Sequence, residues 1–419
     1  MKILVLNSGS SSVKFQVIET DLERMEAGRD LTLAAGQVEK IGLADSRLTM
    51  KVPERPPYQD YREILEHRAA IGWAIRILTD PEHGILDAVT EIEAVGHRVV
   101  HGGEEFASSV LITPEVAAKI DACSVLAPLH NPANLRGYQA ALAALPDVPH
   151  VAVFDTAFHQ TMPGHAFLYG IPFQLYTKHA LRRYGFHGTS HRYVAYRGCQ
   201  MLGWNRDSKR IITVHLGNGC SAAAIDHGRS IDTSMGFTPL EGLLMGTRSG
   251  DMDPAIIPWL MAMEELTLHQ VNTMLNKHSG LYGVSGVSSD MRELLDARSR
   301  GRTRADVAFR IFCYRVKKYI GAYTAAMGGA DAVFMTGGIG ENSPEVREQA
   351  LTGMEYMGLD LDVQRNAGLV GREGEISTDG SRVKALVVPT NEEKTIARDV
   401  VRVLEGVMPT FEPPESFDS

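Results

Sequence analysis

The chain has 419 residues, of which 44% are hydrophobic and 22% charged, and its formal net charge is −9. This length allows two or more domains, each with its own core. The excess of acidic residues argues against nucleic acid or an anionic membrane as the main partner. The four cysteines have no CxxC or zinc-site spacing, which favours free thiols. The N-terminus has no signal-peptide pattern and no run approaches the length of a membrane span, so we expect a cytoplasmic protein.

The first 18 residues, MKILVLNSGSSSVKFQVI, predict a strand, a turn and a second strand. Residues 3–6 form a short apolar run typical of a buried strand, and 13–18 alternate as its antiparallel partner does. The turn between them is rich in hydroxyls and small side chains, and Gly9 allows a positive φ, so its backbone amides could hold an anion. An ordinary polar hairpin has the same pattern, and this segment alone leaves both interpretations open.

Three helices and two strands are predicted before the middle of the chain. Apolar residues at helical spacing predict a helix at 58–78, and further helices are expected at 114–122 and 134–145. The segment from Ile92 forms a buried strand that ends in a basic cluster around Arg98. The apolar strand 151–154 ends at Asp155, whose carboxylate is either a helix N-cap or a functional group.

The second half repeats the opening pattern. An irregular stretch around 156–172 indicates a domain boundary, and a helix follows at about 190–202. Residues 211–225 again read as an apolar strand, a glycine-containing turn and a second apolar strand. The glycine-rich segment 233–253 has no periodicity, which is typical of a functional loop. Further strands that end in turns are expected at 332–342 and at 385–393, with a helix to about 404.

Two similar hairpins, one in each half, suggest an internal duplication. Two such turns facing each other could grip a polyphosphate, and the third turn, from Gly337 to Asn342, has glycines suited to the close approach of a base and ribose. None of the three fits the P-loop pattern or the dinucleotide fingerprint. The sequence therefore predicts a nucleotide site of another kind.

Phosphoryl transfer needs positioned cations and a metal, because negative charge spreads over the transferring group. Arg98, His187 and Arg248 are the candidate cations, although arginines at strand ends and in loops are often solvated surface groups. We expect His101, His159 and His191 to be structural hydrogen-bonding residues. Magnesium takes one or two protein oxygens besides water and phosphate, so one Glu and one Asn would suffice.

The chain resembles the acetate kinase family, within the larger superfamily of sugar kinases, heat-shock 70 proteins and actin. The resemblance covers nearly the whole chain and rests on nine blocks in family order. They are LNSGSSSVK (6–14), GHRVVHGG (96–103), PLHNPAN (128–134), VFDTAFHQTMP (153–163), YGFHGTSH (184–191), HLGNGCS (215–221), MGFTPLEGLLMGTRSGDMDP (235–254), TGGIGENS (336–343) and PTNEE (389–393).

This resemblance implies a fold and an activity. The fold would be α/β, with two duplicated ribonuclease-H-like (actin-like ATPase) domains and a nucleotide cleft between them. Residues 1–156 plus 393–419 would form an N-terminal acetokinase domain, and 157–392 a C-terminal nucleotide-binding domain. The enzyme would transfer the γ-phosphoryl group of ATP to acetate directly, in line and reversibly, giving acetyl phosphate and ADP. The family also implies a homodimer, and from the net charge and the lack of a membrane span we expect neither nucleic acid nor membrane as a partner.

The resemblance also implies a role for individual residues. Arg98 would hold the acetate carboxylate, His187 and Arg248 would stabilise the transferring phosphoryl group, and His130 would assist. Asp155 would orient the substrate or arginine side chains, since acetate is already ionised at pH 7 and needs no general base. The acyl pocket would consist of Val100, Leu129, Phe186 and Pro239. Asn7 and Glu392 would support Mg²⁺, with Mn²⁺ able to substitute. ATP or ADP would contact Lys14, His215, Leu216, Gly217, Asn218, Gly219, Asp290, Met291, Arg292, Gly338, Ile339, Gly340, Glu341 and Asn342.

Two alternatives follow from the same pattern. A propionate or butyrate kinase differs only in its acyl pocket, and one methylene discriminates by only about 1–3 kcal/mol. The branched Val100 favours acetate, with propionate accepted more weakly. A non-enzymatic ATP-driven switch is the other alternative, but those branches lack the cluster of Arg98, His187 and Arg248. The chain departs from the family pattern at Gly337, where alanine is expected, and in its acidic tail.

Overall fold

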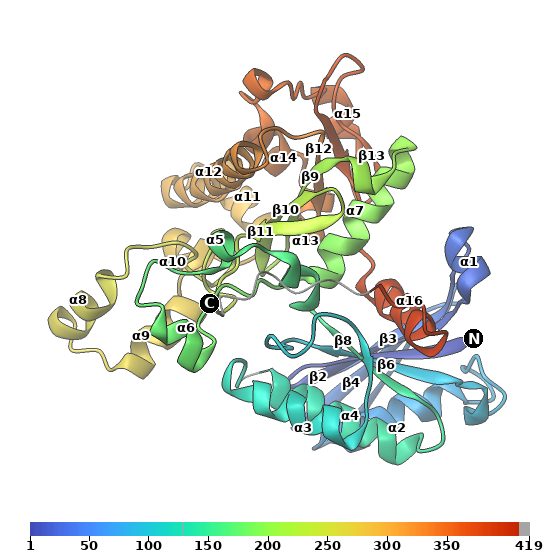
Figure 1. The fold of residues 1–419 in the computed structure, drawn as a ribbon. Coiled ribbons are helices and arrows are strands. Elements are labelled where there is room, and N and C mark those ends of the chain that lie inside the picture. Colours follow the sequence, from blue (N-terminus) through green and yellow to red (C-terminus); the bar gives the residue numbers. More distant parts are fainter. Residues whose placement is uncertain (129, 410–419) are drawn as a thin grey trace. The chain divides into compact units, whose positions relative to one another are not determined.

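The computed structural model describes residues 1–128 and 130–409, and the chain divides into two compact units (Figure 1). Unit 1 contains residues 1–160 and 391–409, and unit 2 contains residues 161–390. Each unit contains one mixed β-sheet with helices packed on it.

The sheet of unit 1 has eight strands in the order β5-β4-β3-β2-β1-β6-β8-β7. Strand β1 pairs antiparallel with β2 and parallel with β6, and β6 in turn pairs parallel with β8. The strands are β1 (Lys2–Ser8), β2 (Ser12–Glu19), β3 (Leu31–Glu39), β4 (Leu43–Lys51), β5 (Tyr58–Ile64), β6 (Ala94–Val99), β7 (Val110–Leu111) and β8 (His150–Phe154).

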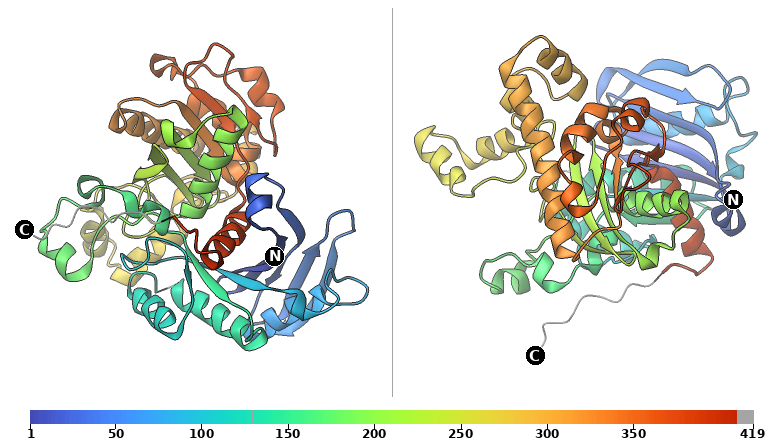
Figure 2. Two further views of the ribbon diagram at one scale, coloured as in Figure 1. Left: turned by 45° about the vertical axis from the view of Figure 1, so that its right-hand side comes forward. Right: turned by 90° about the horizontal axis from the view of Figure 1, so that it is seen from above.

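Helices cover both faces of this sheet (Figure 2). The helices of unit 1 are α1 (Leu22–Glu26), α2 (His67–Leu78), α3 (Pro114–Ala122), α4 (Asn131–Ala144) and α16 (Glu392–Leu404), with short 3₁₀ turns at Val89–Glu91, Cys123–Val125 and Ala157–Thr161. Successive residues of a strand point to opposite faces. Leu4 and Leu6 of β1 therefore join the core under α2 and α4, whereas Ile3 and Val5 pack against α16.

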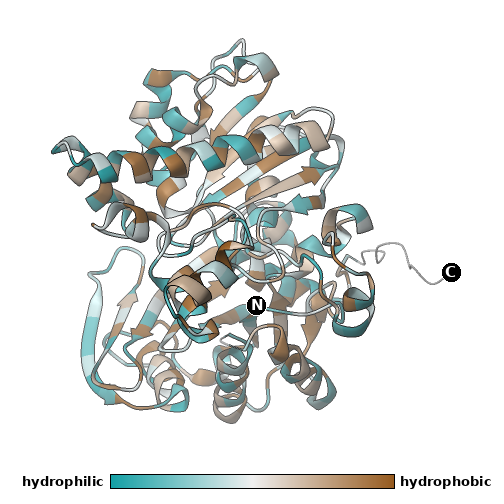
Figure 3. Cartoon of the chain, turned by 90° about the vertical axis from the view of Figure 1, so that its left-hand side faces the viewer, coloured by the Kyte–Doolittle hydropathy of each residue, from teal (hydrophilic) through white to brown (hydrophobic). Residues whose placement is uncertain are grey.

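The sheet of unit 2 has six strands in the order β11-β10-β9-β12-β14-β13. They are β9 (Arg210–Leu216), β10 (Cys220–Asp226), β11 (Arg229–Thr233), β12 (Ala332–Thr336), β13 (Gly374–Glu375) and β14 (Lys384–Val387). The long helix α12 packs on β9 and β10, and its hydrophobic and hydrophilic residues interleave along its length (Figure 3).

The helices of unit 2 connect and flank these strands. They are α5 (Gly164–Phe167), α6 (Gln174–His179), α7 (Gly188–Leu202), α8 (Ile256–Met263), α9 (Leu268–Lys277), α10 (Gly280–Ser285), α11 (Met291–Ser299), α12 (Thr303–Ala326), α13 (Gly337–Asn342), α14 (Pro344–Leu351) and α15 (Val363–Gly368), with 3₁₀ turns at Arg206–Ser208 and Glu355–Met357. Helix α7 packs on β9 and β12.

The two sheets share one topology, in agreement with the predicted duplication. The order β3-β2-β1-β6-β8 in unit 1 corresponds strand by strand to β11-β10-β9-β12-β14 in unit 2, with the same parallel and antiparallel pairings. Even the irregularity of the outer hairpin recurs, because the register shifts in both β2–β3 and β10–β11. In each unit three parallel strands therefore end at one edge of the sheet, where ligands of such folds bind.

Two local predictions were wrong. The predicted helix 58–78 begins only at His67, because Tyr58–Ile64 forms the edge strand β5 paired with β4. The mostly polar residues of Tyr58–Ile64 show neither a clear helical nor a clear strand periodicity. The segment forms a strand because it pairs with β4, a contact that its own sequence does not show. The predicted turn at 337–342 is the short helix α13. Gly337 has φ +77, and a Cβ there would lie 2.7 Å from the carbonyl oxygen of Leu216, so glycine suits this position.

All four cysteines are buried and free, as predicted. Over residues 1–128 and 130–409, none of the helices combines the length and the apolar character that crossing a bilayer demands.

Candidate active site

In unit 1 the predicted residues gather at the carboxyl edge of the three parallel strands. The pairing of Leu6 with His97 places Asn7 beside the position of Arg98, and Arg98 lies opposite Val153, two residues before Asp155. Asn7 is also the cross-strand partner of Lys14. The sheet register therefore brings together Asn7, Arg98 and Asp155, which lie far apart in the sequence.

The partly buried Arg98 and the buried Asp155 form a bidentate ion pair. Arg98 Nε lies 3.0 and 3.1 Å from the two carboxylate oxygens, and Nη2 lies 2.5 Å from Oδ2. Glu392 Oε2 lies 3.8 Å from Nε. Burial lowers the pKa of Arg98, but the charges of Asp155 and Glu392 outweigh burial and raise it above its ordinary value. Asp155 therefore holds this arginine, which favours the functional interpretation of the carboxylate over a helix cap.

Two glutamates begin helix α16 next to this pair. Asn391 caps the helix, since its side-chain oxygen accepts the N–H of Lys394 at 2.8 Å. Burial raises the pKa of Glu392, with a further rise from Asp155, although Arg98 opposes it. Burial and Glu392 also raise the pKa of Glu393. In both cases burial is the largest cause of the raised pKa, and the neighbouring acid adds to it.

A second cluster connects the loop after β6 to helix α4. Asn134 Oδ1 accepts the N–H of Val100 at 3.0 Å, and its Nδ2 donates to the carbonyl of Ser8 at 2.8 Å. Burial and the neighbouring His130 lower the pKa of His101 to about 4, which agrees with its predicted structural role. The predicted pocket residue Leu129 lies outside the described residues. The structural roles of Asn131 and Asn134 were not predicted, although both lie in the motif PLHNPAN. Their buried side-chain amides bond the backbone of neighbouring loops.

In unit 2, His187 stands at the start of helix α7 in a left-handed conformation with φ 56. Its Nδ1 lies 2.8 Å from the Ser221 hydroxyl, and its ring stacks on His215 with centroids 4.4 Å apart. The other side of Ser221 contacts His191, which lies fully buried. His191 is thus a structural hydrogen-bonding residue, as predicted, and it acts on the residue that holds His187.

Arg248 lies beside His187 at the β9–β10 turn. A Cβ on Gly219 would stand 3.4 Å from Arg248 Nη1 and 3.6 Å from His187 Nε2, so both groups flank this glycine. Arg248 Nη1 donates to the Pro239 carbonyl at 3.2 Å. Burial lowers its pKa. Within the described part of the chain, no acid forms an ion pair with Arg248.

Arg183 and Glu241, which sequence reasoning missed, fix the loop that carries Pro239 and Arg248. Arg183 Nη1 donates to the carbonyls of Thr233, Ser234 and Met235 at 2.9, 3.2 and 3.2 Å. Its Nη2 donates to Glu241 Oε1 at 2.7 Å. One guanidinium thus holds four residues at the end of β11 and the start of the long loop. In the sequence, only the length of this loop and its lack of periodicity indicated that it needs such a support.

A pocket of about 950 Å³ lies in unit 2 where three predicted segments meet. Of the predicted nucleotide residues it is lined by Gly217, Asn218, Asp290, Met291, Arg292, Gly338, Ile339 and Asn342. Ser289, Leu295, Ser343 and Glu345 also line it and were not predicted. His215, Leu216, Gly219, Gly340 and Glu341 do not line it. Glu341 instead accepts the N–H groups of Gly337 and Thr390, at 2.9 and 3.2 Å, and so supports the pocket wall.

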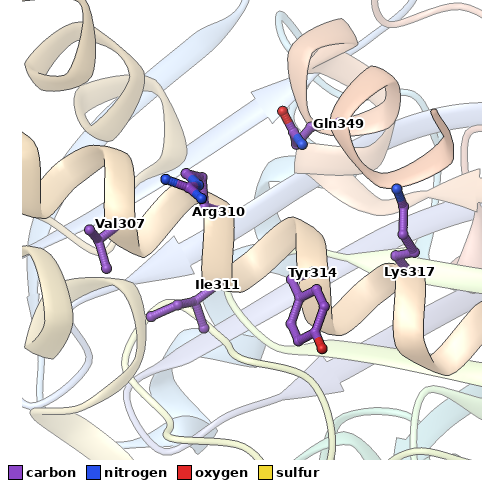
Figure 4. A pocket seen from close by; sticks show the side chains of 6 residues that line it. All are labelled: Val307, Arg310, Ile311, Tyr314, Lys317 and Gln349. Atoms are coloured by element: carbon purple, nitrogen blue, oxygen red, sulfur yellow. The ribbon is translucent and has the colours of Figure 1, made fainter. Parts of the chain in front are cut away.

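A smaller pocket of about 440 Å³ lies on the outer side of α12 (Figure 4). Arg310, Tyr314 and Lys317 of α12 and Gln349 of α14 line it. None of these residues belongs to the predicted site, so this pocket has no part in the chemistry considered below.

The chain is similar to known proteins over almost its whole length. A family model described as the acetokinase family matches residues 2–398. Acetate kinase from Caldanaerobacter subterraneus is 51% identical over 408 residues, which cover 97% of this chain and 100% of that protein. The crystal structure of Porphyromonas gingivalis acetate kinase matches with a TM-score of 0.91 at 50% identity, over 96% of this chain and 99% of that one. A propionate kinase from Francisella tularensis matches with a TM-score of 0.87 at 40% identity, over 95% and 98%.

Proposed function

Since this chain belongs to the acetokinase family and is an enzyme of the kinase type, we propose that it transfers the γ-phosphoryl group of ATP to acetate, reversibly and in line. The observation that carries the proposal is the partly buried Arg248, which has no acid partner in the described chain and stands beside His187. An uncompensated guanidinium is suited to the negative charge that spreads over the phosphoryl oxygens.

The nucleotide would occupy the pocket of unit 2. Its helical wall at Gly338 and Ile339 leaves room for a flat base, because neither a Cβ nor a polar side chain intrudes at Gly338. The turn at Gly217 and Asn218 would approach the phosphates with its backbone. This turn leads directly to Gly219, which His187 and Arg248 flank. We propose that the transferring group is stabilised there.

Acetate would bind Arg98 in unit 1. The guanidinium has five N–H donors, and Asp155 occupies its Nε and Nη2 side, so Nη1 remains for a substrate carboxylate. Because acetate is ionised at pH 7, Asp155 need not remove a proton. Its role would be to hold Arg98 in one rotamer. His130 would assist from the neighbouring loop, and Lys14 would contact the nucleotide.

Asn7 and Glu392 would hold Mg²⁺, with Mn²⁺ able to substitute. Amide and carboxylate oxygens are suitable magnesium ligands, and water and phosphate oxygens would complete the coordination. Burial raises the pKa values of Glu392 and Glu393, and neighbouring acids add a smaller rise. A divalent cation bound there would stabilise the charged carboxylates. When bound, the ion supplies charge neutralisation of the phosphate oxygens.

Acetate would be the preferred acid, because the branched side chain of Val100 would narrow the acyl pocket. The specific alternative is a kinase that prefers a longer acid, because a propionate kinase is 40% identical to this chain. Hydroxamate formation from acetate, propionate and butyrate with ATP and magnesium decides between them. Formation of no acyl phosphate from any acid would overturn the kinase proposal. A higher kcat/KM for propionate than for acetate would assign the alternative.

The proposed partner besides the substrates is a second copy of the chain. Helix α8 carries no charged residue and buries none of its side chains, with Trp259 56% and Met263 64% exposed. An uncharged apolar face can meet its own copy without repulsion. Trp259→Lys should convert a dimer into a monomer in light scattering, and a wild-type monomer would overturn this assignment. Cytoplasmic location remains a prediction, as does the division into an acetokinase and a nucleotide-binding domain.

A further inference from the structure

Four side chains of unit 2 form a continuous hydrogen-bonded chain that ends at His187. Thr213 Oγ1 on β9 lies 2.7 Å from Nδ1 of His191 on α7. His191 Nε2 lies 2.8 Å from the hydroxyl of Ser221 on β10. That hydroxyl lies 2.8 Å from His187 Nδ1. Thr213, His191 and Ser221 have no exposed surface.

The protons of this chain can point in one of two directions, because each hydroxyl has a single proton to donate. In the first, Thr213 donates to His191, His191 to Ser221, and Ser221 to His187 Nδ1. In the second, every donation is reversed, and the Thr213 proton must find an acceptor outside the chain. Among residues 1–128 and 130–409, the Thr213 hydroxyl has no hydrogen-bond partner besides His191. A buried donor without an acceptor is costly, so the first direction is favoured.

We propose that Thr213, His191 and Ser221 are positioning residues that hold neutral His187 with its proton on Nε2. The hydrogen bond at one ring nitrogen determines which tautomer the other nitrogen presents. The inference rests on the proposed function, in which this Nε2–H is the donor offered to the transferring phosphoryl group. Nε2 also faces Gly219 from the same side as Arg248, so the donor and the cation converge.

The stack of His187 on His215 supports the same arrangement. The rings lie 4.4 Å apart at 29°, and His215 Nδ1 is itself bonded to the Ser190 hydroxyl at 2.8 Å. Ser190 contacts the Thr390 hydroxyl at 2.8 Å. The stack on His215 restricts rotation of the His187 ring. The Nε2–H of the tautomer that the Ser221 hydrogen bond favours therefore points in one fixed direction.

The test is the tautomer of His187 in the full chain labelled with ¹⁵N-histidine. Long-range proton–nitrogen spectra at pH 8, where an ordinary histidine is neutral, identify which nitrogen carries the proton. The His187 signals are those lost in His187→Ala. We expect Nε2–H in the wild type, a mixture of tautomers in Thr213→Val, and loss of the single tautomer in Ser221→Ala. We also expect kcat to fall about threefold to tenfold in Thr213→Val and roughly 10- to 100-fold in Ser221→Ala, with the KM for ATP within about twofold.

Thr20→Val is the matched control. Thr20 is equally buried and donates to Asp30 at 2.7 Å in unit 1, so the substitution removes a buried hydroxyl with no connection to His187. It should lower stability and leave kcat unchanged. The inference is overturned if His187 of the wild type carries its proton on Nδ1, or if Thr213→Val leaves the tautomer unchanged. Both measurements can be made even if Ser221→Ala fails to fold. A tautomer that shifts while kcat stays at the wild-type value confirms the chain and overturns the role of His187 in transfer.

Discussion

Arg98 and Arg248 belong to two units built on one strand order, yet their surroundings are opposite. Arg98 is clamped by Asp155 and approached by Glu392, so its charge is largely neutralised. Among the residues that the structure describes, Arg248 is held by the carbonyl of Pro239 and the sulfur of Met245, and burial lowers its pKa. A neutralised, fixed guanidinium suits a carboxylate whose charge does not change. An uncompensated one suits charge that develops during the reaction.

The largest expected effect comes from removing the uncompensated cation. Arg248→Ala should lower kcat by about 100- to 1,000-fold while ATP still binds, because the lost interaction is strongest in the transition state. Arg365→Ala is the control, since this arginine of the same unit pairs with Asp362 and Asp379 on the surface. Steady-state kinetics and nucleotide titration measure the two quantities. A kcat within about threefold of the wild type would mean that Arg248 does not meet the transferring group.

Releasing the clamped arginine should have a different signature. Asp155→Asn keeps the size of the side chain but removes the charge that fixes Arg98, so the acetate KM should rise and kcat/KM for acetate fall roughly 10- to 100-fold. Asp379→Asn provides the control at an exposed pair. An unchanged acetate KM together with a raised ATP KM would contradict the assignment of Arg98 to the acceptor.

The hairpins and the duplication were predictable, because each depends on local pattern. Motifs indicated the candidate cations, and their roles stay predictions. Strand β5 was not, since only its pairing with β4 distinguishes it from the adjacent helix. The opposite electrostatics of Arg98 and Arg248 were not predictable either. Asp155 and Glu392 reach Arg98 from remote segments, and no sequence feature shows that Arg248 lacks such a partner. Arg183 lies outside the nine blocks that carry the family resemblance, and Ser221 ends the block HLGNGCS. Neither role could be predicted from the sequence, because both depend on tertiary contacts.

Glu392 tests whether acids near Arg98 serve a metal as well as the arginine. Its pKa is raised by burial, so protonation begins at a higher pH than for an ordinary glutamate, and the protonated form cannot bind a cation. The Mg²⁺ concentration for half-maximal activity should therefore rise as the pH falls. Glu392→Gln should raise it roughly tenfold at pH 8 and remove most of that pH dependence. Glu375→Gln, at a salt bridge of unit 2, is the control. Equal magnesium requirements in the variant and the wild type from pH 6 to 8 would exclude Glu392 as a ligand.

The smallest expected effect concerns the strand that carries Arg98. His97 precedes it in β6 and is buried, with Nε2 2.9 Å from Nδ1 of His150, whose own Nε2 bonds the Leu145 carbonyl at 3.0 Å. Burial lowers the pKa of both histidines, and the charge of His150 lowers that of His97 further.

The unfolded chain therefore binds more protons than the native one below about pH 6.5, the ordinary histidine value. Stability from this pair is present above that pH and is lost as the pH falls towards the depressed native values, by up to about 1.4 kcal/mol per pH unit for each proton. Denaturant unfolding at pH 7.5, 6.5 and 5.5 measures the slope, and His97→Gln should reduce it. If His97→Gln keeps the wild-type dependence of unfolding free energy on pH, the acid sensitivity arises elsewhere. The pair of His97 and His150 then does not make the strand that carries Arg98 sensitive to acid.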